Sequence, residues 1–339
     1  MFKKFYRGIK NFIVEEYKFL ICMLFFYIVC IFPVNYYIVI GGGISDVSER
    51  IEISEETKSK GSFNLSYVSE LRGTVLTYLL SYVIPSWDRN NMDDYKYSEE
   101  ESYEDIEFRG DIDLKSANSS AIKTAYTLAG KKVEKKSSKI YVVAIFSEYD
   151  PELKVGDQLI SINGVAFESI EEYAEYFQSL KVSDYAKVRV IRNKKEIDVD
   201  CKIHELENRK ILGVSLQIVN DYDTEPDVSI KFKSSESGPS GGLITTLEIY
   251  DKLVKADVTK GLKIAGTGTV DSYGNVGDIG GVRYKLIGAC HGDADVFIVP
   301  DGKNYKEALK VKKEKNLKIE IVAVKTVEEA IDKLSKLEI

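Results

Sequence analysis

Histidine and cysteine are scarce in this chain of 339 residues, which contains two histidines and four cysteines. Cys22 and Cys30 lie within one apolar run, which leaves only Cys201 and Cys290 for the rest of the chain, so no disulfide framework or metal-ligand spacing is present. We therefore expect no metal and no other cofactor. Proline is also scarce, but the composition is 44% hydrophobic and 30% charged, which is typical of a globular chain. The length allows two or three compact domains.

The chain has no excess of basic residues. The net charge is −7, and residues 1–40 carry five Lys/Arg against two Glu, or +3, so the remainder is near −7 − 3 = −10. This balance argues against a phosphate-binding surface, and we expect no nucleic-acid partner. The sequence also has no G-x-x-x-x-G-K-[ST] loop, so we expect no ATP-driven unfolding of large substrates.

One long hydrophobic run covers residues 19–40, 22 residues without a charge. A helix of this length would measure about 33 Å, enough to cross a hydrocarbon core of roughly 30 Å. The run therefore predicts a single transmembrane helix after a cytoplasmic N-terminus of residues 1–18. Five basic residues precede it and only Arg50 follows closely, so residues 41 onward are predicted to lie outside the cell membrane. A cleaved signal peptide fits less well, because the run is too long and no A-x-A site follows.

Two regions follow the apolar run. Residues 41–125 are predicted to be an extracytoplasmic linker, with a helix at its end over Ala117–Leu128 closed by Gly130. Residues 126–204 have a β-rich pattern with a buried strand from Ile140, a helix over Ser169–Leu180 and a hairpin around Asn193.

Two short motifs in this β-rich region resemble PDZ domains of bacterial proteases. They are Leu153–Asp157, which reads LKVGD, and Ile160–Gly164, which reads ISING. The resemblance implies binding of extended peptides by strand addition to a sheet edge. The usual glycine-containing carboxylate loop is not evident at Lys136–Lys139, which leaves recognition of a terminal carboxylate open. In the alternative interpretation the module packs against its neighbour and binds nothing.

Residues 205–339 alternate strands and helices, which predicts an α/β (α+β) domain. The segment SESGPSGG stands between a predicted strand and a predicted helix, so Ser240 would lie beside unpaired backbone N–H groups that can stabilise an oxyanion. Gly238, Gly241 and Gly242 would let the backbone approach a substrate closely. Such a cluster alone is typical of an ordinary turn.

A second segment, residues 264–285, ends in Lys285, 45 residues after Ser240. The two segments together resemble the proteolytic domain of Lon-type peptidases, which use a Ser-Lys dyad. The resemblance implies that Ser240 is the nucleophile, that Lys285 is the base and that Thr267 hydrogen-bonds the lysine. The order of a PDZ domain and a Lon-type domain behind one N-terminal span resembles the membrane-anchored, pheromone-processing Lon-like proteases of Gram-positive bacteria.

Two positions depart from the Lon pattern. Gly241 follows the nucleophile where alanine is usual, and Ser237 stands where many Lon domains have an acid, with Glu236 beside it. The first change is sterically harmless. The second could alter the rate or the oxyanion geometry, but it leaves the dyad in place.

The chemistry requires Lys285 to be a neutral amine near pH 7, although a free lysine has a pKa near 10.4. The apolar neighbours Val282 and Leu286 are expected to disfavour its charged form. Neither His204 nor His291 is placed to be a convincing triad base. We therefore expect an ATP-independent serine endopeptidase that cleaves secreted peptides or small membrane proteins.

Three further expectations complete the hypothesis. The alternative function is a non-catalytic peptide-binding scaffold at the cell surface. The S-x-x-K match of Ser120 and Lys123 lacks its usual partner motifs and is read as chance. Analogy with ring-forming Lon domains predicts a homo-oligomer.

Overall fold

The computed structural model describes residues 2–54, 57, 59–182, 184–231, 233 and 235–337. They form two compact units, one made of Met1–Gly41 and Val68–Tyr95 and the other of Gly42–Tyr67 and Lys96–Ile339. Strands β1 (Pro33–Asp46) and β3 (Ser62–Thr74) each contribute residues to both units.

The smaller unit contains helix α1 (Phe2–Ile31), the first part of β1, the end of β3, helix α2 (Val75–Leu80) and strand β4 (Asp88–Asn91). Here β1 and β4 pair antiparallel, with Tyr36 opposite Asn91. Arg89 stacks on the ring of Tyr82, with its guanidinium carbon 3.8 Å from the ring centroid.

The predicted transmembrane helix over residues 19–40 is wrong. Helix α1 ends at Ile31, and Pro33, which lacks the N–H needed to continue a helix, begins β1. The uncharged part of α1 from Phe19 to Ile31 is 31 − 19 + 1 = 13 residues, which is only about 20 Å long. Within the described ranges, no helix combines the length and the apolar character needed to cross a membrane.

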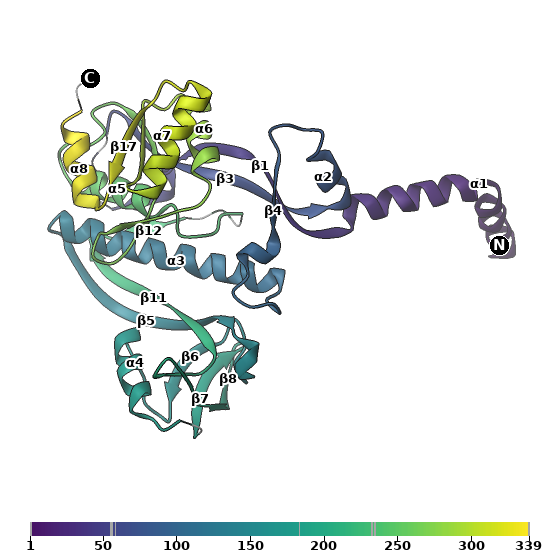
Figure 1. The fold of residues 1–339 in the computed structure, drawn as a ribbon, viewed down its shortest axis with the longest axis horizontal. Coiled ribbons are helices and arrows are strands. Elements are labelled where there is room, and N and C mark those ends of the chain that lie inside the picture. Colours follow the sequence, from purple (N-terminus) through teal and green to yellow (C-terminus); the bar gives the residue numbers. More distant parts are fainter. Residues whose placement is uncertain are drawn as a thin grey trace. The chain divides into compact units, whose positions relative to one another are not determined.

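The larger unit is built on a sheet with the strand order β17-β16-β13-β3-β1. Its C-terminal elements are β13 (Lys263–Gly266), α6 (Val282–His291), β16 (Val296–Pro300), α7 (Lys303–Lys315), β17 (Glu320–Val324) and α8 (Val327–Ser335). Helices α5 (Gly242–Leu253) and α8 pack on one face, whereas α6 and α7 pack on the other (Figure 1). Both faces of the central strands are covered, which explains the unbroken apolar run of β16.

The predicted linker over residues 41–125 is wrong in one important respect, because part of it belongs to this sheet. Strand β3 pairs in parallel with β13, with Phe63 opposite Ile264 and Leu65 opposite Gly266. Strand β2 (Ile51–Ile53) pairs with β12 (Val228–Ile230). The domain predicted over residues 205–339 therefore also includes strands that precede the β-rich module in the sequence.

Helix α3 (Tyr103–Leu128) is twice as long as the helix predicted from Ala117. Ser102 caps its start in a capping box with Asp105, and Gly130, with φ +62°, follows its end. The helix packs against α5 and contributes Ala121, Ala125 and Tyr126 to the core.

The PDZ-like module has the strand order β11-β5-β6-β7-β8 and one helix. Its elements are β5 (Lys132–Ile145), β6 (Gln158–Ile162), α4 (Ile170–Ser179), β7 (Tyr185–Arg192), β8 (Lys195–Lys202) and β11 (Val214–Glu225). Ser169 caps α4, accepting a hydrogen bond from the Glu172 N–H at 3.1 Å, and the predicted hairpin around Asn193 is present. Between β8 and β11 lies a short pair, β9 (His204–Leu206) and β10 (Arg209–Ile211). Figure 1 shows β5 and β11 running side by side as a long ribbon.

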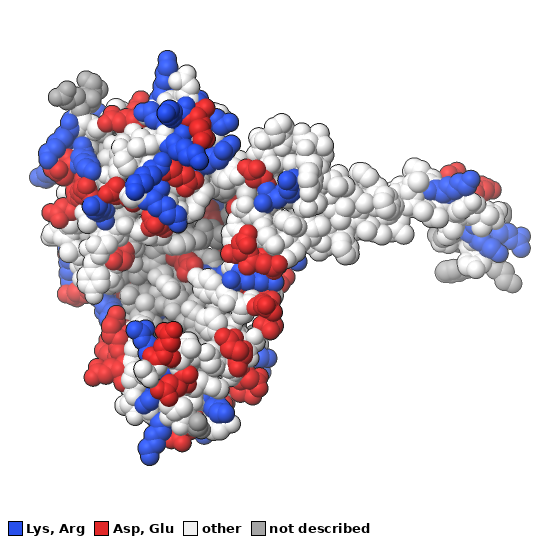
Figure 2. Space-filling model, in the orientation of Figure 1, with Lys and Arg blue, Asp and Glu red and all other residues white. Residues whose placement is uncertain are grey.

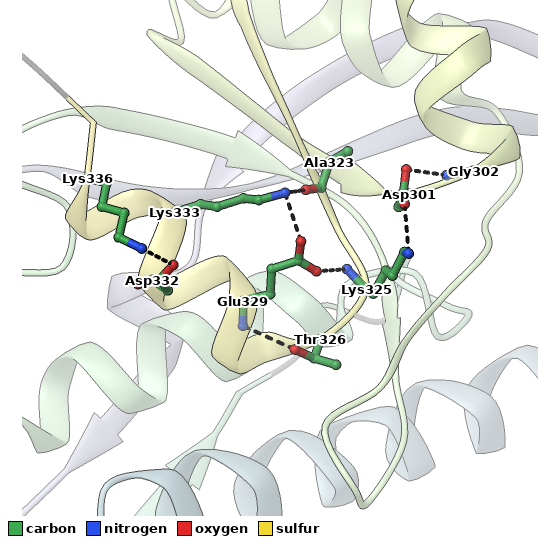
Figure 3. A network of polar contacts seen from close by, with 9 residues as sticks. All are labelled: Asp301, Gly302, Ala323, Lys325, Thr326, Glu329, Asp332, Lys333 and Lys336. Atoms are coloured by element: carbon green, nitrogen blue, oxygen red, sulfur yellow. Dashed lines mark hydrogen bonds and ion pairs between the residues drawn. The ribbon is translucent and has the colours of Figure 1, made fainter.

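A polar network holds α8 to β17 (Figure 3). Thr326 caps the helix by accepting a hydrogen bond from the Glu329 N–H at 3.1 Å. The Glu329 carboxylate accepts a hydrogen bond from the Lys325 N–H at 2.7 Å and pairs with Lys333 at 2.8 Å. Because Asn275 forms a β-bridge with Thr326, the network also supports the turn that leads toward α6.

Candidate active site

Ser240 lies in the turn that leads into α5. It is half-buried, and Gly241 is the N-cap residue of the helix, which begins at Gly242. The carbonyl oxygen of Ser240 accepts hydrogen bonds from the Gly268 N–H at 2.9 Å and from Thr267 Oγ1 at 3.0 Å. The two residues that follow β13 therefore fix the backbone of Ser240.

Thr267 connects the other two predicted catalytic residues. Its side chain is fully buried, and its Oγ1 accepts a hydrogen bond from Lys285 Nζ at 3.1 Å while it donates to the Ser240 carbonyl oxygen. Lys285 lies in the first turns of α6 and is 5% exposed. The structure thus brings Ser240, Thr267 and Lys285 together through a continuous chain of hydrogen bonds.

The surroundings of Lys285 are apolar. Val282 and Leu286, its neighbours on α6, are both fully buried and pack against Ala265 of β13. Removal of an amine from water disfavours its ammonium form. A neutral Lys285 is the form that can accept a proton.

The three glycines around Ser240 have different environments. Gly238 has φ +81°, a conformation that glycine adopts without strain, and its N–H donates to the Gly110 carbonyl oxygen of α3 at 2.8 Å. A methyl group added to Gly241 would lie 3.2 Å from Leu65, and one added to Gly242 would lie 3.0 Å from the Val270 nitrogen. Gly241 and Gly242 thus allow close packing of the turn on β3 and the strand that follows β13.

Two of the three glycine N–H groups around Ser240, which could otherwise serve an oxyanion, are already hydrogen-bonded. The N–H of Gly238 is bonded to Gly110, and the N–H of Gly242 donates to the Pro239 carbonyl oxygen at 3.1 Å. The remaining glycine N–H is that of Gly241.

Sequence reasoning did not identify Gly110 as a residue that supports the site. A methyl group there would lie 3.1 Å from Ser237 Cβ, so α3 approaches the nucleophile turn closely. The sequence feature that could have indicated this role is a glycine inside a helix. Glycine weakens a helix, so its presence there indicates a close packing contact.

The other candidates lie elsewhere. Glu236 pairs with Arg50 at 2.5 Å. His204 belongs to β9, where its ring packs against Tyr149, and His291 is the last residue of α6. Lys123 of the S-x-x-K match lies over the ring of Tyr273 at 5.6 Å. In the part of the chain that the structure describes, no three His, Cys, Asp or Glu side chains are grouped to hold a metal.

The expected peptide-binding edge of the PDZ-like module is covered by the chain itself. Strand β5 pairs with β6 along one edge and with β11 along the other, from Val214 opposite Ile145 to Glu225 opposite Lys132. Leu216 and Ile218 of β11 pack against the core that contains Phe177 of α4. Strand β11 therefore takes the place that an added peptide strand would need beside β5.

Comparison with known proteins identifies both folded regions. Residues 220–336 match the C-terminal proteolytic domain of Lon proteases (S16), and residues 129–203 match the PDZ domain. The Lon protease of Campylobacter jejuni is 30% identical over 156 residues, which cover 44% of this chain and 17% of the relative. That of Desulfatibacillum aliphaticivorans is 27% identical over 161 residues, which cover 44% of this chain and 19% of the relative.

The chain thus spans less than a fifth of the length of these relatives. A solved PDZ domain of an SdrC-like protein from Listeria monocytogenes is 28% identical and covers 23% of this chain and 85% of its own, with a TM-score of 0.22. The chain contains a Lon-type serine protease domain and a PDZ domain, and Ser240, Thr267 and Lys285 all lie within the Lon-type region.

Proposed function

We propose that the protein is an ATP-independent serine endopeptidase with Ser240 as nucleophile and Lys285 as general base. The observation that carries this proposal is the hydrogen-bond chain from Lys285 Nζ through Thr267 Oγ1 to the backbone of Ser240. A buried lysine linked through Thr267 to a serine in the turn before α5 is an arrangement that suits a Ser-Lys dyad.

In this mechanism the neutral amine of Lys285 accepts the proton of Ser240 Oγ as the oxygen attacks the peptide carbonyl. The N–H of Gly241 stabilises the oxyanion that develops. The Lys285 ammonium then protonates the leaving amine, and the resulting acyl-enzyme is hydrolysed by water. Thr267 keeps Nζ oriented throughout, and positioned proton transfer of this kind contributes about 10²–10⁴-fold in rate.

The proposed substrates are secreted peptides or exposed segments of small membrane proteins. Support comes from the sequence, which has no phosphate-binding loop for ATP-driven unfolding. Because β11 covers the β5 edge, we propose that substrates reach Ser240 without first adding a strand to β5. By analogy with Lon-type domains we also propose a homo-oligomer, which analytical ultracentrifugation of the purified chain would reveal.

We further propose that the enzyme works at the outer face of the cell membrane. Ten large apolar side chains between Phe19 and Phe32 are 45–68% exposed, and Figure 2 shows an uncharged surface along this part of α1. Apolar surface of this extent is unfavourable in water and is typical of a membrane or protein contact. Labelling of intact cells with a membrane-impermeant thiol reagent, at a cysteine introduced in place of exposed Tyr273, would test this location.

The activity is tested by comparing peptide hydrolysis by the wild type with that by Ser240→Ala and Lys285→Ala variants. Ser235→Ala is the matched control, because Ser235 is an exposed serine of the same segment. We expect both dyad variants to lose at least about 10³-fold in kcat and the control to stay within about 3-fold of the wild type. Equal activity of the wild type and the Ser240→Ala variant would refute the assignment of the Ser-Lys dyad. Peptide binding by the wild type without cleavage would instead support the scaffold alternative.

A further inference from the structure

Ser66 carries an unexplained buried hydroxyl. Within the described ranges, Ser66 Oγ is the one buried side-chain oxygen or nitrogen without a hydrogen-bond partner, and the residue is fully buried. An unpartnered polar group in a protein interior costs roughly 1–3 kcal/mol. Such groups are rare in native proteins, and each one calls for a reason.

The register of the central sheet places Ser66 beside Thr267. Leu65 of β3 is opposite Gly266, the last residue of β13, in a parallel pair, so Ser66 is level with Thr267, the residue that follows β13. The side chain of Leu65 faces α5 and contacts Gly241. Since side chains alternate along a strand, Ser66 points to the opposite face, where α6 packs.

Helix α6 crosses β3 at this level. On one side of β3, Lys285 of α6 donates to Thr267 at the end of β13. On the other side, the backbone of β1 touches α6, since a methyl group at Gly42 would overlap the Tyr284 carbonyl oxygen and one at Gly288 would overlap Gly43. Strand β3 lies between β13 and β1 in the sheet, so the part of α6 that carries Lys285 covers Ser66.

We propose that Ser66 is a positioning residue for the general base. This inference rests on the proposed function. When the proton moves from Ser240 Oγ to Lys285 Nζ, the lysine becomes an ammonium with three N–H donors. Thr267 Oγ1 accepts one of them, and Ser66 Oγ accepts a second until the proton passes to the leaving amine. Because Ser66 Oγ has no hydrogen-bond partner in the structure, its acceptor capacity is open to the ammonium.

The first test measures stability and kinetics of the full chain with Ser66→Ala. Removal of an unpartnered hydroxyl should leave the urea midpoint unchanged or raise it. The kcat should fall about 10-fold with KM unchanged, because the lost bond is made to the charged form. Ser66→Thr retains the hydroxyl and should restore most of the kcat.

A matched control is Ser119→Ala. Ser119 is a buried serine of α3 whose hydroxyl does have a partner, the Asn220 carbonyl oxygen at 2.7 Å. Its loss should lower the urea midpoint and leave kcat unchanged, the reverse of the pattern expected for Ser66. A Ser66→Ala variant that behaves like this control would overturn the proposal.

The second test titrates Lys285 directly and does not depend on peptide hydrolysis. An acceptor for the ammonium stabilises the charged form, so Ser66→Ala should move the titration of Lys285 to lower pH. The measurement is the NMR signal of ¹³C-labelled lysine, assigned with Lys285→Gln. The other titratable side chains on the adjoining stretches of β3 and α6 are Tyr67, Arg283 and Tyr284, and none of them is changed.

An unchanged titration of Lys285 in Ser66→Ala would refute the role of Ser66 even if the wild type is a protease. Conversely, a shifted titration in a protein that cleaves nothing would support the contact and refute the proposed function. The two failures are therefore distinguishable.

Discussion

Replacement of Thr267 by valine tests the link between the proposed base and the nucleophile turn. Valine fills nearly the same volume as threonine, so the fully buried site gains no cavity, but two hydrogen bonds disappear. The Ser240 carbonyl oxygen keeps its bond from the Gly268 N–H at 2.9 Å. The Lys285 amine loses its hydrogen bond to Thr267 Oγ1.

The expected loss follows from these contacts. A hydrogen bond to a group that becomes charged contributes about 1.5–3 kcal/mol, which corresponds to roughly 10- to 150-fold in kcat. The loss of unfolding free energy should be smaller, about 0.5–1.5 kcal/mol, because Ser240 remains bonded. Thr267→Ser retains the hydroxyl and should stay within about 3-fold of the wild-type kcat, although loss of the methyl group costs about 1 kcal/mol of stability.

The assay combines initial rates on a fluorogenic peptide with urea denaturation of the same preparations. A Thr267→Val variant with wild-type kcat would refute the positioning role of the hydroxyl. Equal loss of kcat in Thr267→Ser and Thr267→Val would also refute this role, because the activity would then depend on the methyl group of Thr267 and not on its hydroxyl.

Three further predictions concern backbone, charge and thiol groups. Gly238→Ala should lose about 1–2 kcal/mol in urea denaturation because φ is +81°, whereas Gly280, which is equally open but has an ordinary φ, should tolerate alanine. The hydrogen bond from Lys333 holds the pKa of Glu329 below its usual value of 4.5. The ionised Glu329 carboxylate therefore stabilises the fold above pH 4.5, and this stabilisation is lost as the pH falls through the lowered pKa. Glu329→Gln should therefore be less stable than the wild type at neutral pH, and the urea midpoints of the two should converge in acid. Burial raises the pKa of the Cys201 thiol to about 12, so it should resist alkylation at pH 8 until urea unfolds the chain; rapid labelling of the native protein would contradict this.

The sequence predicted the parts of the site that depend on local patterns. A glycine-rich turn before a helix and a lysine four residues after Gly281 are short-range features, and both segments fold as their patterns indicate. The contact between Lys285 and Thr267 could be anticipated only through the family resemblance, because it joins two elements across the sheet.

The non-local partners could not be read from the sequence in the same way. Strand β3 lies about 200 residues before β13 in the chain, so no local pattern indicated that these two strands pair with each other. The long apolar run was misread because Pro33 and the aromatic residues after it change a helix into a strand within one hydrophobic segment. Apolar character alone does not distinguish the two.

The ribbon of β5 and β11 has a consequence for how this chain is divided. Both ends of the PDZ module leave through one antiparallel pair, in which Glu134 lies opposite Asp223 and Val133 opposite Thr224. Neighbouring strands in such a pair are about 5 Å apart, so a two-residue hairpin turn could join them directly. The PDZ module is thus an insertion connected through a single pair of strands. Its natural or engineered replacement need not change the strand order of the catalytic sheet.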